Sequence, residues 1–239
     1  MVIFVSYLSF IDDYKLEEIV SNMLNKCTNS IREAEKKFAK NVIDPFSIIF
    51  EMSGFGIDIS QWTINEKLRQ AQKTLSNHIG DFHQKLLGSF DGWENLSIGG
   101  CIDVVCHERK IIAEIKNKHN TIKGSNKSTL YHSLNDLVMK KGQQYKDYTA
   151  YYVEVIPSKP IRYDKPFTPS DSSTGSKCPE NELIRVIDGY SFYALVTGID
   201  NALKQVFEKL PLVIKKLNPE YEFINSQLIE NYFNAAYGV

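Results

Sequence analysis

The run from Leu96 to Lys116, LSIGGCIDVVCHERKIIAEIK, constrains the fold more than any other part of this 239-residue chain. Two apolar segments rich in β-branched residues flank the charged cluster HERK, which is typical of two strands joined by a turn. Near-continuous apolar strands are usually covered on both faces. The sequence therefore predicts a largely buried β-hairpin.

The second arm of this hairpin carries two charged side chains. Side chains alternate between the faces of a strand, so Ile112, Glu114 and Lys116 share a face, with the carboxylate and ammonium about 6–7 Å apart. A hairpin that turns at HERK brings Asp103 close to Glu114. Neighbouring carboxylates repel, so such a pair is usually held by a cation. Oxygen ligands favour Mg²⁺ or Ca²⁺, with Mn²⁺ as a substitute.

These groups suit phosphodiester hydrolysis, which needs a metal to polarise the phosphate and positive charge near the reacting oxygens. Asp103 and Glu114 are predicted to hold the metal, and the backbone carbonyl of Ile115 is a further candidate ligand. Lys116 is predicted to orient the water or stabilise the developing charge. The alternative is a solvated surface ion pair, but the upstream aspartate and the apolar neighbours favour a catalytic site.

Hydrophobic periodicity predicts the elements around the hairpin. Helices are expected over 13–40 as one or two segments, over 63–87 and over 128–145. The segment TAYYVEVIP reads as a strand that stops at its proline. Residues 157–181 carry five of the eight prolines and are expected to lack regular structure. A short strand and helices follow, with a break near Pro219.

This order of elements predicts an α/β fold with a mixed central sheet flanked by helices and helical additions at both ends. No linker divides the chain clearly, so one endonuclease domain is expected over 1–239. Within it, 1–95 is mainly helical, 96–157 forms the catalytic core, and 158–239 holds a DNA-reading segment and the C-terminal helices.

Composition limits the class of protein. The net charge of -1, from 28 Lys and Arg against 29 Asp and Glu, excludes a strongly polybasic nucleic-acid binder, so any contact with DNA must come from a local basic surface. Four scattered cysteines without a CxxC pair fit a reducing cytoplasm. The N-terminal run MVIFVSYLSFI is too short to span a bilayer and is expected to be a core segment. We therefore expect a cytoplasmic protein without a membrane partner.

The spacing D-x10-E-x-K resembles the motif of the PD-(D/E)xK nuclease superfamily, with Ile102 in place of its proline. The blocks AEIKNKHNT, YYVEVIP, KPFTPSD, and IRVIDGYSFYALVTG with NALKQVFEKLP resemble type II restriction endonucleases that cut GGNCC sites. This resemblance runs from about residue 99 to residue 212. It implies magnesium-dependent cleavage of unmethylated double-stranded DNA at GGNCC in a prokaryotic cytoplasm. It also implies a homodimer, and a companion cytosine methyltransferase that protects host DNA.

Two segments are candidates for contacting DNA. The polar loop after the catalytic strand carries phosphate-binding side chains, namely Asn117, Lys118, His119, Asn120, Thr121, Lys123, Ser125, Asn126 and Lys127. Guanine is read by Arg or Lys and cytosine by Asp or Glu. Candidates in or beside the proline-rich segment are Arg162, Lys165, Asp171, Ser172, Lys177, Asn181 and Arg185. For any one of them, an ordinary solvated loop residue is the alternative.

Accessory residues are also expected, because an acidic residue from an upstream helix often assists the metal site in this superfamily. Glu51 and Glu66 are the candidates, although Glu66 also forms a capping box with Thr63. Gln143 is a third candidate, with a solvent-facing position as the alternative.

Two other functions remain open from the sequence. A repair or recombination nuclease of the same superfamily would prefer damaged or branched DNA. A non-catalytic DNA-binding module would use its carboxylates only structurally.

Overall fold

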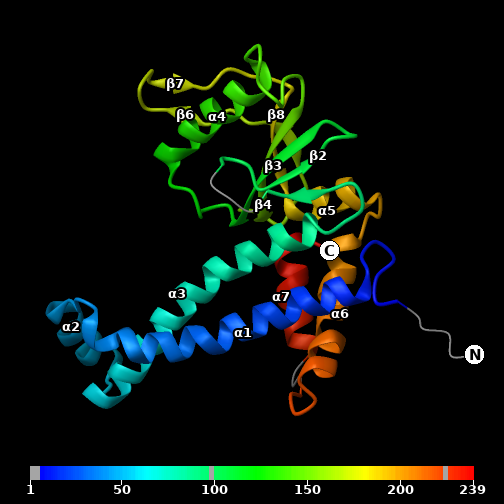
Figure 1. Cartoon of the computed structure of the whole chain (residues 1–239). Helices are drawn as coiled ribbons and strands as arrows, with labels where there is room; N and C mark the ends of the chain where they lie inside the picture. The colour runs from blue at the N-terminus through cyan, green and yellow to red at the C-terminus, as the bar shows by residue number, and fades with distance from the viewer. Residues whose placement is uncertain (1–5, 97–99, 223–225) are drawn as a thin grey trace, which may run out of the picture. The chain divides into compact units, whose positions relative to one another are not determined.

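The computed structural model describes residues 6–96, 100–222 and 226–239 (Figure 1). The chain forms two compact units, one from the described parts of 1–20 and 82–239 and the other from 21–81. In the N-terminal apolar run, Leu8 and Ile11 are buried as predicted, and residues 1–5 lie outside the described residues. None of the described helices is both long and apolar enough to cross a membrane.

Residues 13–87 are helical, with short breaks. The elements are α1 (Asp13–Lys37), η1 (Phe38–Lys40), α2 (Pro45–Phe55) and α3 (Ile59–Leu87). α3 begins earlier than predicted because the Asp58 carboxylate accepts a hydrogen bond from the Gln61 N–H at 2.8 Å and caps the helix. The Thr63 hydroxyl donates to the Ile59 carbonyl within the helix. The predicted capping box of Thr63 and Glu66 is therefore wrong.

A six-stranded sheet forms the centre of the larger unit. Its strands, in spatial order, are β1 (Glu94–Asn95), β2 (Val104–Cys106), β3 (Ile111–Lys118), β4 (Thr149–Ile156), β8 (Ile184–Asp188) and β5 (Asp164–Pro166). β3, β4 and β8 are parallel, and the other pairs are antiparallel. The predicted hairpin is confirmed as β2 and β3, and the mixed sheet flanked by helices is the predicted restriction-endonuclease-like architecture.

Helices cover both faces of this sheet (Figure 1). On one face, α4 (Gly124–Met139) packs Leu134 and Val138 into a core with Ile112 and Tyr152. On the other face, α5 (Gly189–Thr197) places the Phe192 ring 5.8 Å from that of Tyr151. A side chain at Gly189 would collide with the backbone of Val155, so glycine permits the close approach of α5 to β4. The helices α6 (Ala202–Leu217) and α7 (Ser226–Tyr237) complete the chain, with the predicted break between them.

The polar loop after β3 is shorter than predicted. β3 continues through Lys118, so Asn117 and Lys118 belong to a strand. α4 begins at Gly124 and places Ser125, Asn126 and Lys127 on its first turn. α4 ends at Met139, before the predicted end at 145, and the next residue, Lys140, is extended with a ψ of 136°.

The proline-rich segment is more regular than predicted. It contains β5 and a separate two-stranded sheet of β6 (Ser170–Asp171) and β7 (Ser176–Lys177). β5 lies at the edge of the main sheet, where Pro166 removes no hydrogen bond from an inner strand. The prediction of irregular structure is therefore wrong for these short strands.

Candidate active site

The β2–β3 hairpin brings Asp103 and Glu114 together. Val104 pairs with Ala113, so Asp103, just before β2, lies beside the part of β3 that carries Glu114. The Asp103 N–H donates to the Ala113 carbonyl at 2.8 Å, and its carboxylate accepts from the Ile115 N–H at 2.7 Å. These bonds hold the aspartate side chain against the strand that carries the glutamate.

Glu114 is almost completely buried, at 9% exposure, and forms an ion pair with Lys116 on the same face of β3. Burial and the nearby charge of Asp103 raise the pKa of Glu114 to about 7, although Lys116 opposes the rise. Burial also raises the pKa of Asp103, opposed by its hydrogen bond from the Ile115 N–H. Without a cation, the two carboxylates therefore resist ionising together.

The donor set fits a hard divalent cation. The buried carboxylate of Glu114 lies close to the half-buried carboxylate of Asp103, and the backbone carbonyl of Ile115 is a further candidate oxygen donor. A cation between the carboxylates would relieve their repulsion and favour their ionised forms. Oxygen donors of this kind suit Mg²⁺, Ca²⁺ or Mn²⁺.

A residue from an upstream helix does reach this site, but it is Gln84. Its side chain, in the last turn of α3, hydrogen-bonds to the Asp103 carboxylate. The sequence analysis missed Gln84 because it considered acidic residues of the upstream helices, whereas glutamine is neutral and this one is distant from the hairpin along the chain. The position of the predicted helix end, just before the hairpin, was the available signal.

The three predicted accessory residues have other surroundings in the structure. In the 21–81 unit, the Glu51 carboxylate accepts from the Trp62 indole N–H at 2.9 Å, and Glu66 binds Arg69 at 2.6 Å. Gln143 is exposed in the turn that precedes β4.

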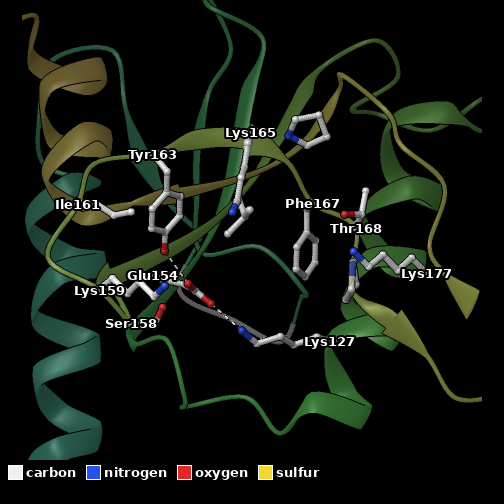
Figure 2. Close-up of a pocket in the computed structure, with 13 residues that line it drawn as sticks. Lys127, Glu154, Ser158, Lys159, Ile161, Tyr163, Lys165, Phe167, Thr168 and Lys177 are labelled. Atoms are coloured by element: carbon white, nitrogen blue, oxygen red, sulfur yellow. Dashed lines mark hydrogen bonds and ion pairs between the residues drawn. The ribbon is translucent and has the colours of Figure 1, made fainter.

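The row beside Lys116 contains acidic residues that the sequence analysis missed. Lys116 is in register with Glu154 on β4, and Glu154 with Asp188 on β8. The buried Glu154 carboxylate accepts from Lys127 Nζ and from the Tyr163 hydroxyl, both at 2.6 Å (Figure 2). Lys127 and Tyr163 are therefore fixed beside β4, the strand next to β3.

A basic groove opens beside Glu154 of this row. It encloses about 520 Å³ and lies around Glu154, Tyr163 and Phe167 (Figure 2). Four of its lining residues are lysines, namely Lys127, Lys159, Lys165 and Lys177. Such a local positive surface suits a phosphate backbone, even though the chain as a whole is almost neutral.

Several residues that were predicted to contact DNA form hydrogen bonds or ion pairs with other residues of the protein. Arg162 bonds to Asp200 at 2.6 Å and Arg185 to Asp164 at 2.6 Å. Asn181 accepts from the Leu183 N–H at 2.9 Å. Asp171 is buried, and its carboxylate bonds to His132 and Ser173.

The other candidates present polar groups toward solvent. The exposed ones are Lys118, Asn120, Thr121, Lys123, Ser125, Asn126, Lys165, Ser172 and Lys177. Asn117 and His119 are half-buried, and Asn117 Oδ1 and His119 Nδ1 have no hydrogen-bond partner among the described residues. Unsatisfied buried atoms of this kind are available to a ligand.

Comparison with known proteins identifies the family of this chain. The Eco47II restriction endonuclease family matches residues 8–218. The chain is 44% identical over 239 residues to the type II restriction enzyme Eco47II of Escherichia coli, covering 98% of this chain and all of that relative. It is 32% identical over 212 residues to the type II restriction enzyme Sau96I of Staphylococcus aureus, covering 87% and 80% of the two chains. The chain therefore belongs to the Eco47II restriction endonuclease family and is a type II restriction endonuclease.

Proposed function

We propose that this enzyme uses Mg²⁺ to hydrolyse unmethylated double-stranded DNA at GGNCC, with Asp103, Glu114 and Lys116 as its cutting site. The observation that carries the proposal is the neighbouring pair of carboxylates, Glu114 buried and Asp103 half-buried, with Lys116 on the same strand face as Glu114. Family membership supports site-specific cleavage and a requirement for a divalent metal.

Each group has a distinct role in this proposal. Asp103, Glu114 and the Ile115 carbonyl hold Mg²⁺, which supplies polarisation of the phosphate and activation of the attacking water. Lys116 orients that water or stabilises the charge that develops on the phosphate oxygens. Gln84 orients the Asp103 carboxylate through its hydrogen bond.

Digestion of unmethylated phage DNA tests the proposed activity and specificity together. With Mg²⁺, we expect discrete fragments whose sequenced ends map to GGNCC, and with chelator we expect intact DNA. Counting cut sites by their central base pair shows whether that pair is read. Fragments at another sequence would reject GGNCC. Preferential cutting of branched DNA would favour a repair nuclease, and intact DNA in every metal would favour a non-catalytic module.

The lysines of the groove are proposed to bind the DNA backbone. Lys165→Ala and Lys177→Ala should each weaken binding to all sequences and reduce the slope of log affinity against log salt by about 1, because each removes about one phosphate contact. Anisotropy titrations with Ca²⁺ in place of Mg²⁺ measure this slope without cleavage. Lys141→Ala is a control at an exposed turn. An unchanged slope in both groove variants would reject the backbone contact.

We propose a homodimer that associates through α2. No residue of this helix is buried, and Phe46, Ile49 and Phe50 form an apolar stripe with exposures of 70%, 64% and 75%. Its acidic residue, Glu51, accepts hydrogen bonds from the Ser47 hydroxyl and the Trp62 indole N–H, so its carboxylate is held within its own unit. A palindromic site is naturally read by two subunits related by a twofold axis.

Phe50→Glu should convert the dimer to a monomer, because it places a charge in a desolvated contact. Light scattering should then give a mass near the 27.4 kDa of one chain in place of twice that value. Tyr232→Glu, at a residue with 68% exposure on α7, is the control and should remain dimeric. A monomeric wild-type protein, or a dimeric Phe50→Glu variant, would contradict this interface.

The same proposal covers the extent of the enzyme, its location and the protection of host DNA. We propose that the whole chain, 1–239, acts as one endonuclease, with its catalytic core over 96–157. A cytoplasmic location in a prokaryote gives the enzyme access to incoming DNA. Host DNA is then protected by a companion cytosine methyltransferase, which need not contact the enzyme.

A further inference from the structure

Three metal-binding side chains converge away from the cutting site. His132 lies on α4, Asp171 on β6, and Cys178 directly after β7. One ligand atom from each lies within 4.8 Å of the other two. Imidazole nitrogen, carboxylate oxygen and thiolate sulfur are all ligands of Zn²⁺ in proteins.

We propose that His132, Asp171 and Cys178 bind a Zn²⁺ ion, with water as the fourth ligand. Metal–ligand distances of about 2.0–2.3 Å in a tetrahedron place ligand atoms about 3–4 Å apart. His132 Nε2 already lies 3.1 Å from Asp171 Oδ2. Modest side-chain movement brings the sulfur to the same spacing.

Surrounding bonds hold the ligands in place before any metal binds. Asp171 Oδ1 accepts from the Ser173 N–H at 2.9 Å and its hydroxyl at 2.6 Å, which directs Oδ2 toward His132. The Cys178 N–H donates to the Pro169 carbonyl at 2.8 Å. Such supporting contacts orient metal ligands and fix their geometry.

The charges of the cluster are compatible with a cation. A bound Zn²⁺ deprotonates a coordinating thiol, so Cys178 would bind as a thiolate beside the Asp171 carboxylate, and the ion would offset both negative charges. His132 has a 57% exposed side chain, which gives the ion access from solvent.

Zinc here would fasten the β6–β7 sheet to α4. That sheet carries Ser172 and Lys177 at its turn and edge, and the first turn of α4 carries Lys127. Cross-linking these elements would order the lysines of the groove without placing zinc at the cutting site.

Cobalt substitution tests this site through its thiolate. Purified full-length protein, stripped with chelator and loaded with Co²⁺, should show near-ultraviolet thiolate-to-cobalt absorption and the visible bands of tetrahedral cobalt. His132→Ala and Cys178→Ser should each abolish these bands, and Zn²⁺ should displace them at one equivalent per chain. Because His132 is exposed, its alanine variant should fold normally and separates metal loss from unfolding.

A matched control distinguishes this cluster from the cutting site. The Cys101 thiol lies beside the cutting site, where burial and then the charges of Glu114 and Asp103 raise its pKa, so it would supply the sulfur if cobalt bound there. Cys101→Ser and Glu114→Gln should therefore keep the bands. Zn²⁺ should also raise the Tm of the wild type but not of His132→Ala. Absence of the bands in the wild type, their persistence in His132→Ala, or their loss in Cys101→Ser would overturn the proposal. These experiments do not measure cleavage, so a negative result for zinc leaves the nuclease proposal intact.

Discussion

Glu114→Ala is expected to reduce the rate of DNA cleavage by about 10³-fold or more, while binding to a GGNCC duplex changes only a few-fold. The large effect follows because Glu114, buried beside Asp103, is proposed to hold the metal, whose charge stabilisation acts mainly in the transition state. Binding survives because the groove lysines and exposed polar residues provide separate contacts to DNA. Single-turnover cleavage with Mg²⁺ and anisotropy with Ca²⁺ measure the two quantities.

Lys116→Ala should give the same separation of cleavage from binding, because its ammonium acts on the reacting groups. Glu180→Ala, at an exposed residue outside the hairpin, serves as the control and should cleave at the wild-type rate. If Glu114→Ala cleaved normally, the carboxylates would be structural. If it also lost binding, the site would be needed for docking and the proposed separation of roles would be wrong.

Glu114→Gln is expected to stabilise the metal-free protein at pH 8. The folded-state pKa of Glu114 is about 7, against an ordinary value of 4.5. Because the folded-state pKa is raised, the protonated Glu114 side chain contributes to the free energy of unfolding. This contribution is fully present below about pH 4.5 and is lost as pH rises through about 7. Above that range the ionised carboxylate destabilises the fold by on the order of 1–3 kcal/mol, which the neutral amide avoids.

Urea unfolding in chelator at pH 5 and pH 8 measures this effect. The gain in unfolding free energy should be present at pH 8 and mostly absent at pH 5, and Mg²⁺ should stabilise the wild type more than the variant. Glu180→Gln is the control for loss of a charge at an exposed site. An equal change at both pH values, or a destabilised variant at pH 8, would show that Glu114 is not held against its own ionisation.

The local pattern of the chain was sufficient to predict the hairpin and the pair of carboxylates. Two apolar arms around HERK determine the turn, and the two-residue period of a strand determines that Glu114 and Lys116 share a face. The same reasoning predicted β4, β8 and α5. The position of Asp103 could be predicted in the same way, because a hairpin closed at HERK pairs Val104 with Ala113 and so brings Asp103 close to Glu114.

The surroundings of the site depend on contacts that are distant in sequence. Gln84 reaches Asp103 only because α3 ends beside the hairpin, and Tyr163 reaches Glu154 only because β5 pairs with β8. The individual side chains carry no local signal for these contacts. Arg185 shows the converse, since its charge suggested guanine recognition but the fold pairs it with Asp164.

The most direct test of the central claim is a crystal structure of the enzyme with a GGNCC duplex and Ca²⁺, which occupies the metal site without supporting cleavage. We expect Ca²⁺ between the Asp103 and Glu114 carboxylates at about 2.3–2.6 Å from their oxygens, with a backbone phosphate beside it and Lys116 Nζ facing that phosphate. A duplex bound with its phosphates away from Lys116, or an ion held by other residues, would contradict the account.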